Sequence, residues 1–162
     1  MDIGILLLRL VLGLTLAAHG AQKLFGWFGG PGLQGAAAGM EKLGFVPGRR
    51  SAFLAGLTEA GAGLFLALGL ATPAAAAAGF AVMVVAGVSA HLKQGFFLQK
   101  GGYEYTLVLG LASLSLAFTG AGALSADALL GLQPRGPLWG VLALAAGAAG
   151  SAVQLGQRRE RA

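Results

Sequence analysis

Long apolar segments alternate with short polar ones along the chain, and this pattern predicts a bundle of transmembrane helices. The apolar segments cover residues 3–25, 51–70, 73–92, 103–118 and 137–155. Most of them are close to the roughly 20 residues that an α-helix needs to cross about 30 Å of hydrocarbon. We therefore expect an all-α protein in which a transmembrane four-helix bundle is followed by a fifth, C-terminal transmembrane helix.

The connections divide the chain further. Residues 26–50 contain a short amphipathic piece, 33–43, bounded by clusters of Gly and Pro. The fifth apolar segment and its basic tail follow a polar connection, so we expect a membrane domain over residues 1–132 and a C-terminal extension over residues 133–162. The first apolar segment is too long for a signal-peptide core, and we expect it to be a retained anchor.

Helix starts can be placed at two of the connections. The second and third segments are joined so closely that they must form an antiparallel hairpin. Thr72 is a suitable N-cap for the third segment, with Pro73 at the first helical position. Ser125 is likewise a suitable N-cap for a short helix that ends near Leu132.

Composition agrees with a membrane protein. Hydrophobic residues make up 56% of the chain, charged residues only 10%, and the mean hydropathy is +0.76. A soluble domain carries about 25% charged residues, so these few charges cannot cover a water-facing surface. The net charge of +5 fits loops that face anionic lipid and does not indicate nucleic acid. Because the chain has no cysteine, it forms no disulfide and no thiolate metal site of its own.

The distribution of Lys and Arg predicts the orientation. We call the membrane face at the end of the first segment side A and the opposite face side B. With five spans, Arg135 lies on side B, Arg9 lies inside the first span, and side A carries Lys23, Lys42, Arg49, Arg50, Lys93, Lys100, Arg158, Arg159 and Arg161. The positive-inside rule then puts side A in the cytoplasm of a multi-pass protein of the cell (inner) membrane. If the fifth segment does not cross the membrane, the basic tail lies on side B, and the excess of Lys and Arg on side A becomes smaller.

Ionisable side chains within or next to the apolar segments are the candidate functional residues, because such groups are costly in hydrocarbon and usually face the bundle interior. They are Arg9, His19, Lys23, Glu59, His91 and Glu104. The first and third segments end on side A, and the second and fourth begin there. Four of these side chains therefore lie near one membrane face, while Glu59 and Arg9 lie deeper.

Arg9 and Glu59 form a predicted ion pair. At a rise of 1.5 Å per residue, Glu59 lies about 12 Å below the start of its helix, and Arg9 about 21 Å below Lys23. A buried arginine needs a partner, and a long guanidinium could reach the acid from there. Gly56 and Gly63 lie on the same helical face as Glu59, where small residues allow close helix packing.

Aromatic residues gather at side A and leave two interpretations open. Trp27 and Tyr103 belong to this group and are candidate ligand contacts. An aromatic belt at the membrane surface explains them without any ligand. An aromatic mouth beside His, Lys and Glu side chains would also suit a planar, lipid-soluble ligand such as a quinone. Equally, the ionisable residues could act separately, with histidines bonded to backbone and lysines extended to headgroups. No tight ligand motif indicates a metal site.

At these residues the chain resembles a known family of small integral membrane proteins, the DoxX family. The motifs are residues 19–32, HGAQKLFGWFGGPG, then Leu43-Gly-Phe45, Glu59 in its glycine-rich helix, residues 91–97, HLKQGFF, Gly101-Gly-Tyr-Glu-Tyr105 and Thr119-Gly-Ala-Gly122. The resemblance extends over about residues 3–132. It implies a four-helix membrane core, so that residues from Pro137 onward would be an extension. Gln94 and Thr106 stand where relatives often carry Asn and Pro.

The resemblance also implies a redox setting. Some DoxX-like proteins are subunits of thiosulfate:quinone oxidoreductases, and others associate with enzymes that handle superoxide and thiols. We therefore expect a redox-associated membrane subunit that binds quinone or a soluble redox enzyme at side A. The resemblance leaves open whether the chain is itself catalytic. The alternatives are a non-catalytic scaffold that docks a soluble enzyme and a pathway for small solutes or protons. The family assigns no catalytic residues to this chain, and a homo-oligomer is compatible with all three.

Overall fold

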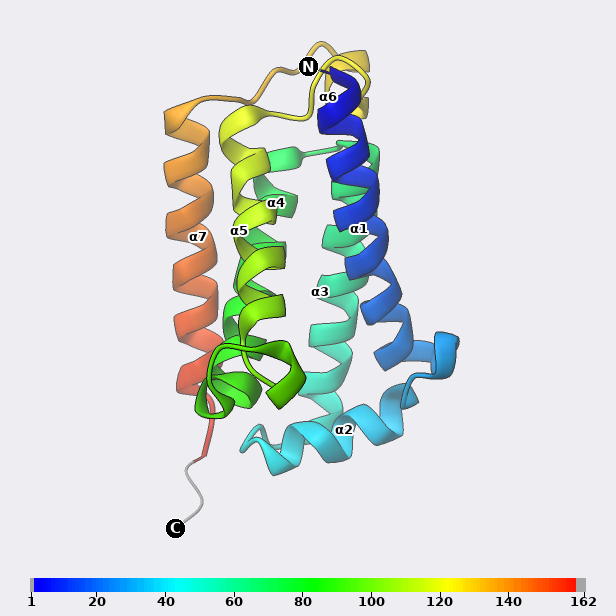
Figure 1. Cartoon of the computed structure of the whole chain (residues 1–162), viewed down its shortest axis with the longest axis vertical. Helices are drawn as coiled ribbons and strands as arrows, with labels where there is room; N and C mark the ends of the chain where they lie inside the picture. The colour runs from blue at the N-terminus through cyan, green and yellow to red at the C-terminus, as the bar shows by residue number, and fades with distance from the viewer. Residues whose placement is uncertain (1, 160–162) are drawn as a thin grey trace.

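The computed structural model describes residues 2–159, and every regular element within that range is helical (Figure 1). The α-helices are α1 (Asp2–Phe25), α2 (Gly32–Lys42), α3 (Gly48–Leu68), α4 (Thr72–Ala86), α5 (Glu104–Thr119), α6 (Ala126–Leu129) and α7 (Pro137–Gly156). Short helical turns follow α1 and α4: η1 (Trp27–Gly29), η2 (Gly87–His91), η3 (Leu92–Gln94) and η4 (Leu98–Lys100). Met1 and residues 160–162, which include Arg161 of the predicted basic tail, lie outside the described range.

The helices α1, α3, α4, α5 and α7 run up and down in a bundle (Figure 1). From its side B end α1 descends to side A, where α2 lies across the end of the bundle; α3 then returns to side B and α4 descends again. α5 rises to side B, where α6 forms the connection to the descending α7. α1 packs on α3, α4 packs on α5, and α7 packs on both α4 and α5. The predicted all-α helical bundle and the antiparallel hairpin of α3 and α4 are confirmed.

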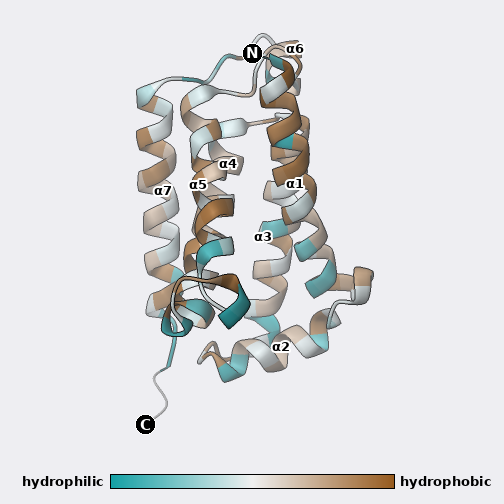
Figure 2. Ribbon diagram, viewed as in Figure 1, coloured by the Kyte–Doolittle hydropathy of each residue, from teal (hydrophilic) through white to brown (hydrophobic). Residues whose placement is uncertain are grey.

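The helices have the length and polarity of membrane spans. α1, α3, the continuous helical stretch Thr72–Gln94, and α7 are long and apolar enough to cross a bilayer, and α5 is a shorter apolar helix. Large apolar side chains are exposed along these helices, for example Val11, Leu57, Val108 and Val141. Polar residues concentrate near α2 and the 92–103 connection (Figure 2). This distribution matches helices whose outer surfaces contact lipid, so the protein is a multi-pass membrane protein.

The predicted helix ends need two corrections, and one of them is that α6 ends at Leu129 and not near Leu132. Thr72 is not the N-cap of α4: the N-cap is Ala71, and Thr72 lies inside the helix, with Pro73 in its first turn as expected. The capping acceptor comes from α6, where the Asp127 carboxylate accepts hydrogen bonds from the backbone N–H groups of Ala71 and Thr72, at 2.7 and 3.0 Å, and from the Thr72 hydroxyl at 2.7 Å. A carboxylate accepts more strongly than a hydroxyl and carries a charge that the helix N-terminus favours. Ser125 caps α6 as predicted, through a bond from the Ala128 N–H.

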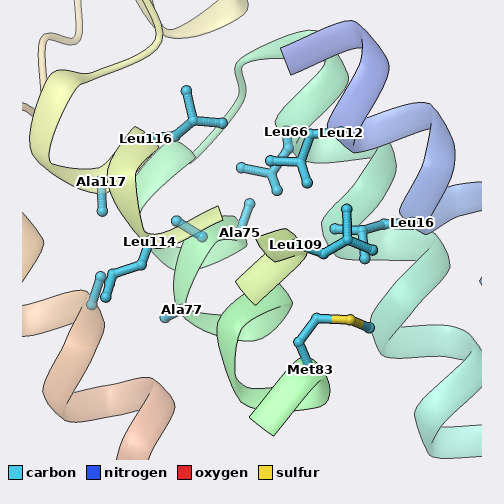
Figure 3. Close-up of a cluster of buried hydrophobic side chains, with 12 residues drawn as sticks. Leu12, Leu16, Leu66, Ala75, Ala77, Met83, Leu109, Leu114, Leu116 and Ala117 are labelled. Carbon is cyan, nitrogen blue, oxygen red and sulfur yellow. The ribbon is translucent and has the colours of Figure 1, made fainter. Parts of the chain in front are cut away.

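The apolar core fills the side B half and the centre of the bundle. Leu12 and Leu16 of α1 meet Leu66 of α3 there (Figure 3). α4 contributes smaller or more flexible side chains such as Ala75 and Met83, and α5 contributes leucines such as Leu109. Leu16 and Leu66 are fully buried. Because water is absent from this layer, any polar side chain placed next to it must find its partners within the protein.

α1 and α3 touch at their backbones. A Cβ added to Gly13 would lie 2.5 Å from the carbonyl oxygen of Gly63, and one added to Gly20 would lie 2.6 Å from the carbonyl oxygen of Gly56. Such distances leave no room for a side chain. The interpretation of Gly56 and Gly63 as packing residues is confirmed, and these contacts fix how far α1 can slide along α3.

Substituting one of these glycines tests the contact. We expect Gly63→Ala to destabilise the protein by about 1–3 kcal/mol, the usual effect of forcing a methyl group into a packed interior. Unfolding by heat or by denaturing detergent, followed by helical circular dichroism in mild detergent, measures this difference. Gly61→Ala on the same helix is the control, because a Cβ there meets nothing within 4 Å; an equal loss in both variants would contradict the contact.

Candidate functional site

Four polar side chains form two hydrogen-bonded pairs near the side A end of the bundle. Lys23 Nζ of α1 donates to Glu59 Oε2 of α3 at 2.6 Å. His19 Nε2 lies 2.6 Å from the Tyr105 hydroxyl of α5. We call these four residues the side A cluster. Its members come from three helices that are far apart in sequence.

The Lys23–Glu59 pair follows from helix geometry. Side chains in an α-helix lean toward the N-terminus of their own helix. Because α1 and α3 are antiparallel, Lys23 leans into the bundle and Glu59 leans toward side A, so the two charged groups approach each other. Glu59 is almost fully buried at 3% exposure, while Lys23 keeps 25% of its side chain accessible. Gly56, one turn from Glu59, leaves space for the stem of Lys23.

The His19–Tyr105 pair joins α1 to α5, two helices that have few other contacts. The rings meet edge to face, with centroids 5.5 Å apart. Which of the two groups donates depends on the histidine tautomer. The pair holds a ring nitrogen and a phenol oxygen, both able to exchange a proton, inside an otherwise apolar helix interface.

The two pairs are neighbours on α1, because His19 and Lys23 are four residues apart and lie on the same face of that helix. The cluster therefore combines a carboxylate, an ammonium group, an imidazole and a phenol in one region. Such a set can donate hydrogen bonds to a ligand oxygen and can hold or pass protons. Within residues 2–159 no three His, Asp or Glu side chains come together in the way that a metal ion requires.

His91 and Glu104 are not brought into contact with Lys23 or Glu59. The Nδ1 atom of His91 pairs with the carbonyl oxygen of Gly101 at 2.7 Å, and Glu104 accepts a bond from the Leu98 N–H at 3.0 Å. Both side chains fasten the connection between α4 and α5. Sequence reasoning placed them at the correct membrane face, but their partners are backbone groups of that connection.

The aromatic candidates Trp27 and Tyr103 likewise have their partners outside the side A cluster. Tyr103 packs edge to face on Phe96, with centroids 5.5 Å apart, inside the α4–α5 connection. Trp27 lies in η1 beyond the end of α1, is 59% exposed, and contacts Phe25 and Phe28. Its position at the membrane surface fits an aromatic belt.

The predicted Arg9–Glu59 ion pair is wrong. Arg9 is buried, and its guanidinium donates to the carbonyl oxygens of Ala121 and Leu124 at side B, the latter at 2.8 Å. Arg9 leans toward the N-terminus of α1 and therefore away from Glu59. Gly69, which ends α3 with a φ of 65°, has no side chain to occupy the space of the guanidinium.

The register of α1 against α3 is a second reason why Arg9 does not pair with Glu59. Gly13 lies against Gly63 and Ala67, so Arg9 is level with the end of α3. Gly20 lies against Gly56 and Ala60, so Glu59 is level with the side A half of α1. At 1.5 Å per residue, the two groups are separated by more than about 12 Å along the helix axis.

Tyr105 and Asp127, which make buried polar contacts in the structure, are not among the candidate residues that the sequence indicates. Two residues along a helix rotate a side chain by roughly 200°, so Tyr103 and Tyr105 must face opposite directions. That rotation was the available signal for an inward-facing phenol. For Asp127 the sequence carried no comparable signal, because its partners Ala71 and Thr72 are more than 50 residues away.

Comparison with known proteins identifies a family. The family model DoxX matches residues 4–92, which is more than half of the chain and contains α1 to η2. No curated protein and no solved structure shows significant similarity to the chain. The motifs between residues 93 and 132 lie outside the match, and the division at residue 132 stays a prediction.

A double-mutant cycle tests the ion pair. We expect Lys23→Met to destabilise the protein by about 3 kcal/mol, at the lower end of the range for breaking a buried pair because Lys23 is partly exposed. The single variant leaves the Glu59 carboxylate without its cation, and adding Glu59→Gln removes that charge. The double variant should therefore recover most of the loss in an unfolding titration in mild detergent. Additive losses from the two substitutions would contradict a coupled pair.

Proposed function

Because the chain belongs to the DoxX family and is a multi-pass membrane protein, we propose that it is a redox-associated membrane subunit that binds the head group of a quinone at the side A cluster. The site in this proposal consists of Lys23, Glu59, His19 and Tyr105. Family resemblance supports the redox setting, and the chemistry of the cluster supports the ligand class.

One observation carries the proposal: donors and acceptors converge from three helices at one depth of an apolar bundle. Lys23 and Tyr105 are the groups suited to a quinone carbonyl, since the ammonium has three N–H donors and only one of them bonds to Glu59. The accessible quarter of the Lys23 side chain leaves this group open to a ligand. If the Lys23–Glu59 pair served only to hold α1 and α3 together, it would not need an ammonium with further N–H donors open to a ligand.

The surroundings suit the rest of a quinone. A quinone has a planar ring with two carbonyl oxygens and a long apolar tail, so its site needs a few polar contacts within an apolar groove. Exposed apolar side chains of α1 and α3, such as Leu14 and Leu57, would lie beside the tail in the lipid phase. Reduction of a quinone consumes two electrons and two protons; His19 and Tyr105 would pass protons, and a soluble redox enzyme docked on side A would supply the electrons.

The fold does not favour a pathway across the membrane. Leu12, Leu16 and Leu66 are buried between the side A cluster and Arg9. This apolar layer separates the polar groups of the two membrane faces, so a proton or solute would have to cross it without a polar partner. The scaffold alternative draws support from the exposed connection at residues 92–101, which offers a surface for a partner protein.

Titration with a short-chain ubiquinone analogue tests the proposal. In detergent, quenching of tryptophan fluorescence should saturate for the wild-type protein. We expect Lys23→Met/Glu59→Gln to raise the Kd about tenfold, because it removes the charge-assisted hydrogen bond to the ring oxygen. His19→Phe/Tyr105→Phe should weaken binding as well.

Lys93→Ala is the matched control, since Lys93 is an exposed cation on the same membrane face outside the cluster. Its affinity should equal that of the wild type. Absence of saturable quenching, or one common Kd for all four proteins, would exclude quinone binding at this site. Co-purification of a soluble enzyme that depends on residues 92–101 and not on Glu59 would then favour the scaffold.

A further inference from the structure

A basic pocket with a volume of about 690 Å³ lies at side A, away from the side A cluster. Its cations come from three separate segments: Lys42 at the end of α2, Lys93 in η3, and Arg158 and Arg159 after α7. Within residues 2–159, no acidic residue lines this pocket. Lys42, Lys93 and Arg159 have no side-chain hydrogen bond or ion pair in the same range. Within the described part of the chain, no acidic side chain neutralises the positive charge of this pocket.

The position of the two arginines is built into the fold. Arg158 Nε donates to the carbonyl oxygen of Leu43 at 3.0 Å, and the guanidinium lies over the Phe45 ring, 5.7 Å from its centroid. The Arg159 N–H donates to the carbonyl oxygen of Gly44 at 2.9 Å. These contacts attach the end of α7 to the connection between α2 and α3. Two cations are thus held opposite the lysines of α2 and η3.

An apolar groove of about 230 Å³ lies beside the pocket, with walls from α3, α4 and α7. Its walls include Phe45, Leu54, Val85 and Gln154. Three of these lie next to a residue of the basic pocket along the chain: Phe45 follows Gly44, Val85 lies one turn from Val88, and Gln154 precedes Leu155. A cationic pocket beside an apolar groove at a membrane surface is complementary to an amphiphile with an anionic head.

We propose that the basic pocket and the apolar groove together bind one anionic phospholipid. The phosphate would lie among Lys42, Lys93, Arg158 and Arg159, and one acyl chain would follow the groove between α3, α4 and α7. Basic pockets at helix ends on the positively charged membrane face recognise such head groups. The groove favours a lipid over free phosphate, because an inorganic ion would use only the cations. By holding α7 against α2, α3 and α4, the lipid would join the C-terminal helix to the remainder of the bundle.

Lipid binding can be measured by native mass spectrometry of the full chain in mild detergent, with phosphatidylglycerol and phosphatidylcholine of identical acyl chains. We expect the wild-type protein to retain phosphatidylglycerol in preference to phosphatidylcholine. Lys42→Gln/Lys93→Gln should weaken phosphatidylglycerol binding about tenfold or more, because it removes two cations next to the phosphate. Arg49→Gln/Arg50→Gln removes the same charge from exposed positions of α3 outside the pocket, and it should bind like the wild type.

A separate substitution tests whether the acyl chain lies in the apolar groove. A Cβ at Gly150 would have its nearest neighbour, the Cβ of Ala81, at 3.9 Å. Gly150→Leu therefore adds a side chain that can fill the groove. Gly61→Leu on the open face of α3 is the control. Gly150→Leu should lower phosphatidylglycerol binding, and Gly61→Leu should not. Equal binding of both lipids, or equal losses in the two charge variants, would overturn the proposal in favour of general surface attraction. Unchanged binding by Gly150→Leu, or displacement of the lipid by millimolar inorganic phosphate, would overturn it in favour of a simple anion site.

Discussion

The backbone contact between α1 and α3 determines most of what the side A half of this protein can do. In lipid there is little hydrophobic force between helices, so a tight contact depends on shape. Gly13, Gly20 and Gly63 provide that shape and leave a single register. In this register the Lys23 ammonium reaches a carboxylate that is almost fully buried, and His19 is turned toward α5. A slip by one turn, about 5.4 Å, would separate the charges and leave an unpaired acid in the bundle.

The two membrane faces solve the problem of buried charge differently. In the side A cluster the polar groups pair through side chains, which can exchange protons and can be displaced by a ligand. At side B the Arg9 guanidinium is held by carbonyl oxygens of the α5–α6 connection, and Asp127 is held by the first turn of α4. The backbone groups that hold Arg9 and Asp127 are not ionisable, so the side B contacts fix structure. The apolar layer around Leu16 and Leu66 keeps the two systems apart.

The sequence predicted the long helices well, but it did not predict the partners of the buried polar side chains. Hydropathy and Gly/Pro placement located the long helices within a few residues, because a bilayer demands an apolar stretch of defined length. Topology also predicted which ionisable residues share a membrane face. It did not predict that Lys23 is the partner of Glu59, since choosing between Lys23 and Arg9 requires the direction in which each side chain leans and the helix register. The capping of α4 by Asp127 likewise depends on tertiary contacts that no local pattern encodes.

The partners of Arg9 impose an order on biosynthesis. The carbonyl oxygen of Ala121 lies 112 positions further along the chain, which a ribosome adding about 5–20 residues per second reaches roughly 6–20 s after Arg9. Until then the guanidinium of α1 can reach only the carbonyl oxygen of Ala67 among its native acceptors, at 3.5 Å. The first turn of α4 likewise lacks the carboxylate of Asp127. The helices can therefore enter the bilayer one after another, but the side B end of the bundle closes only after α5 and α6 have been synthesised.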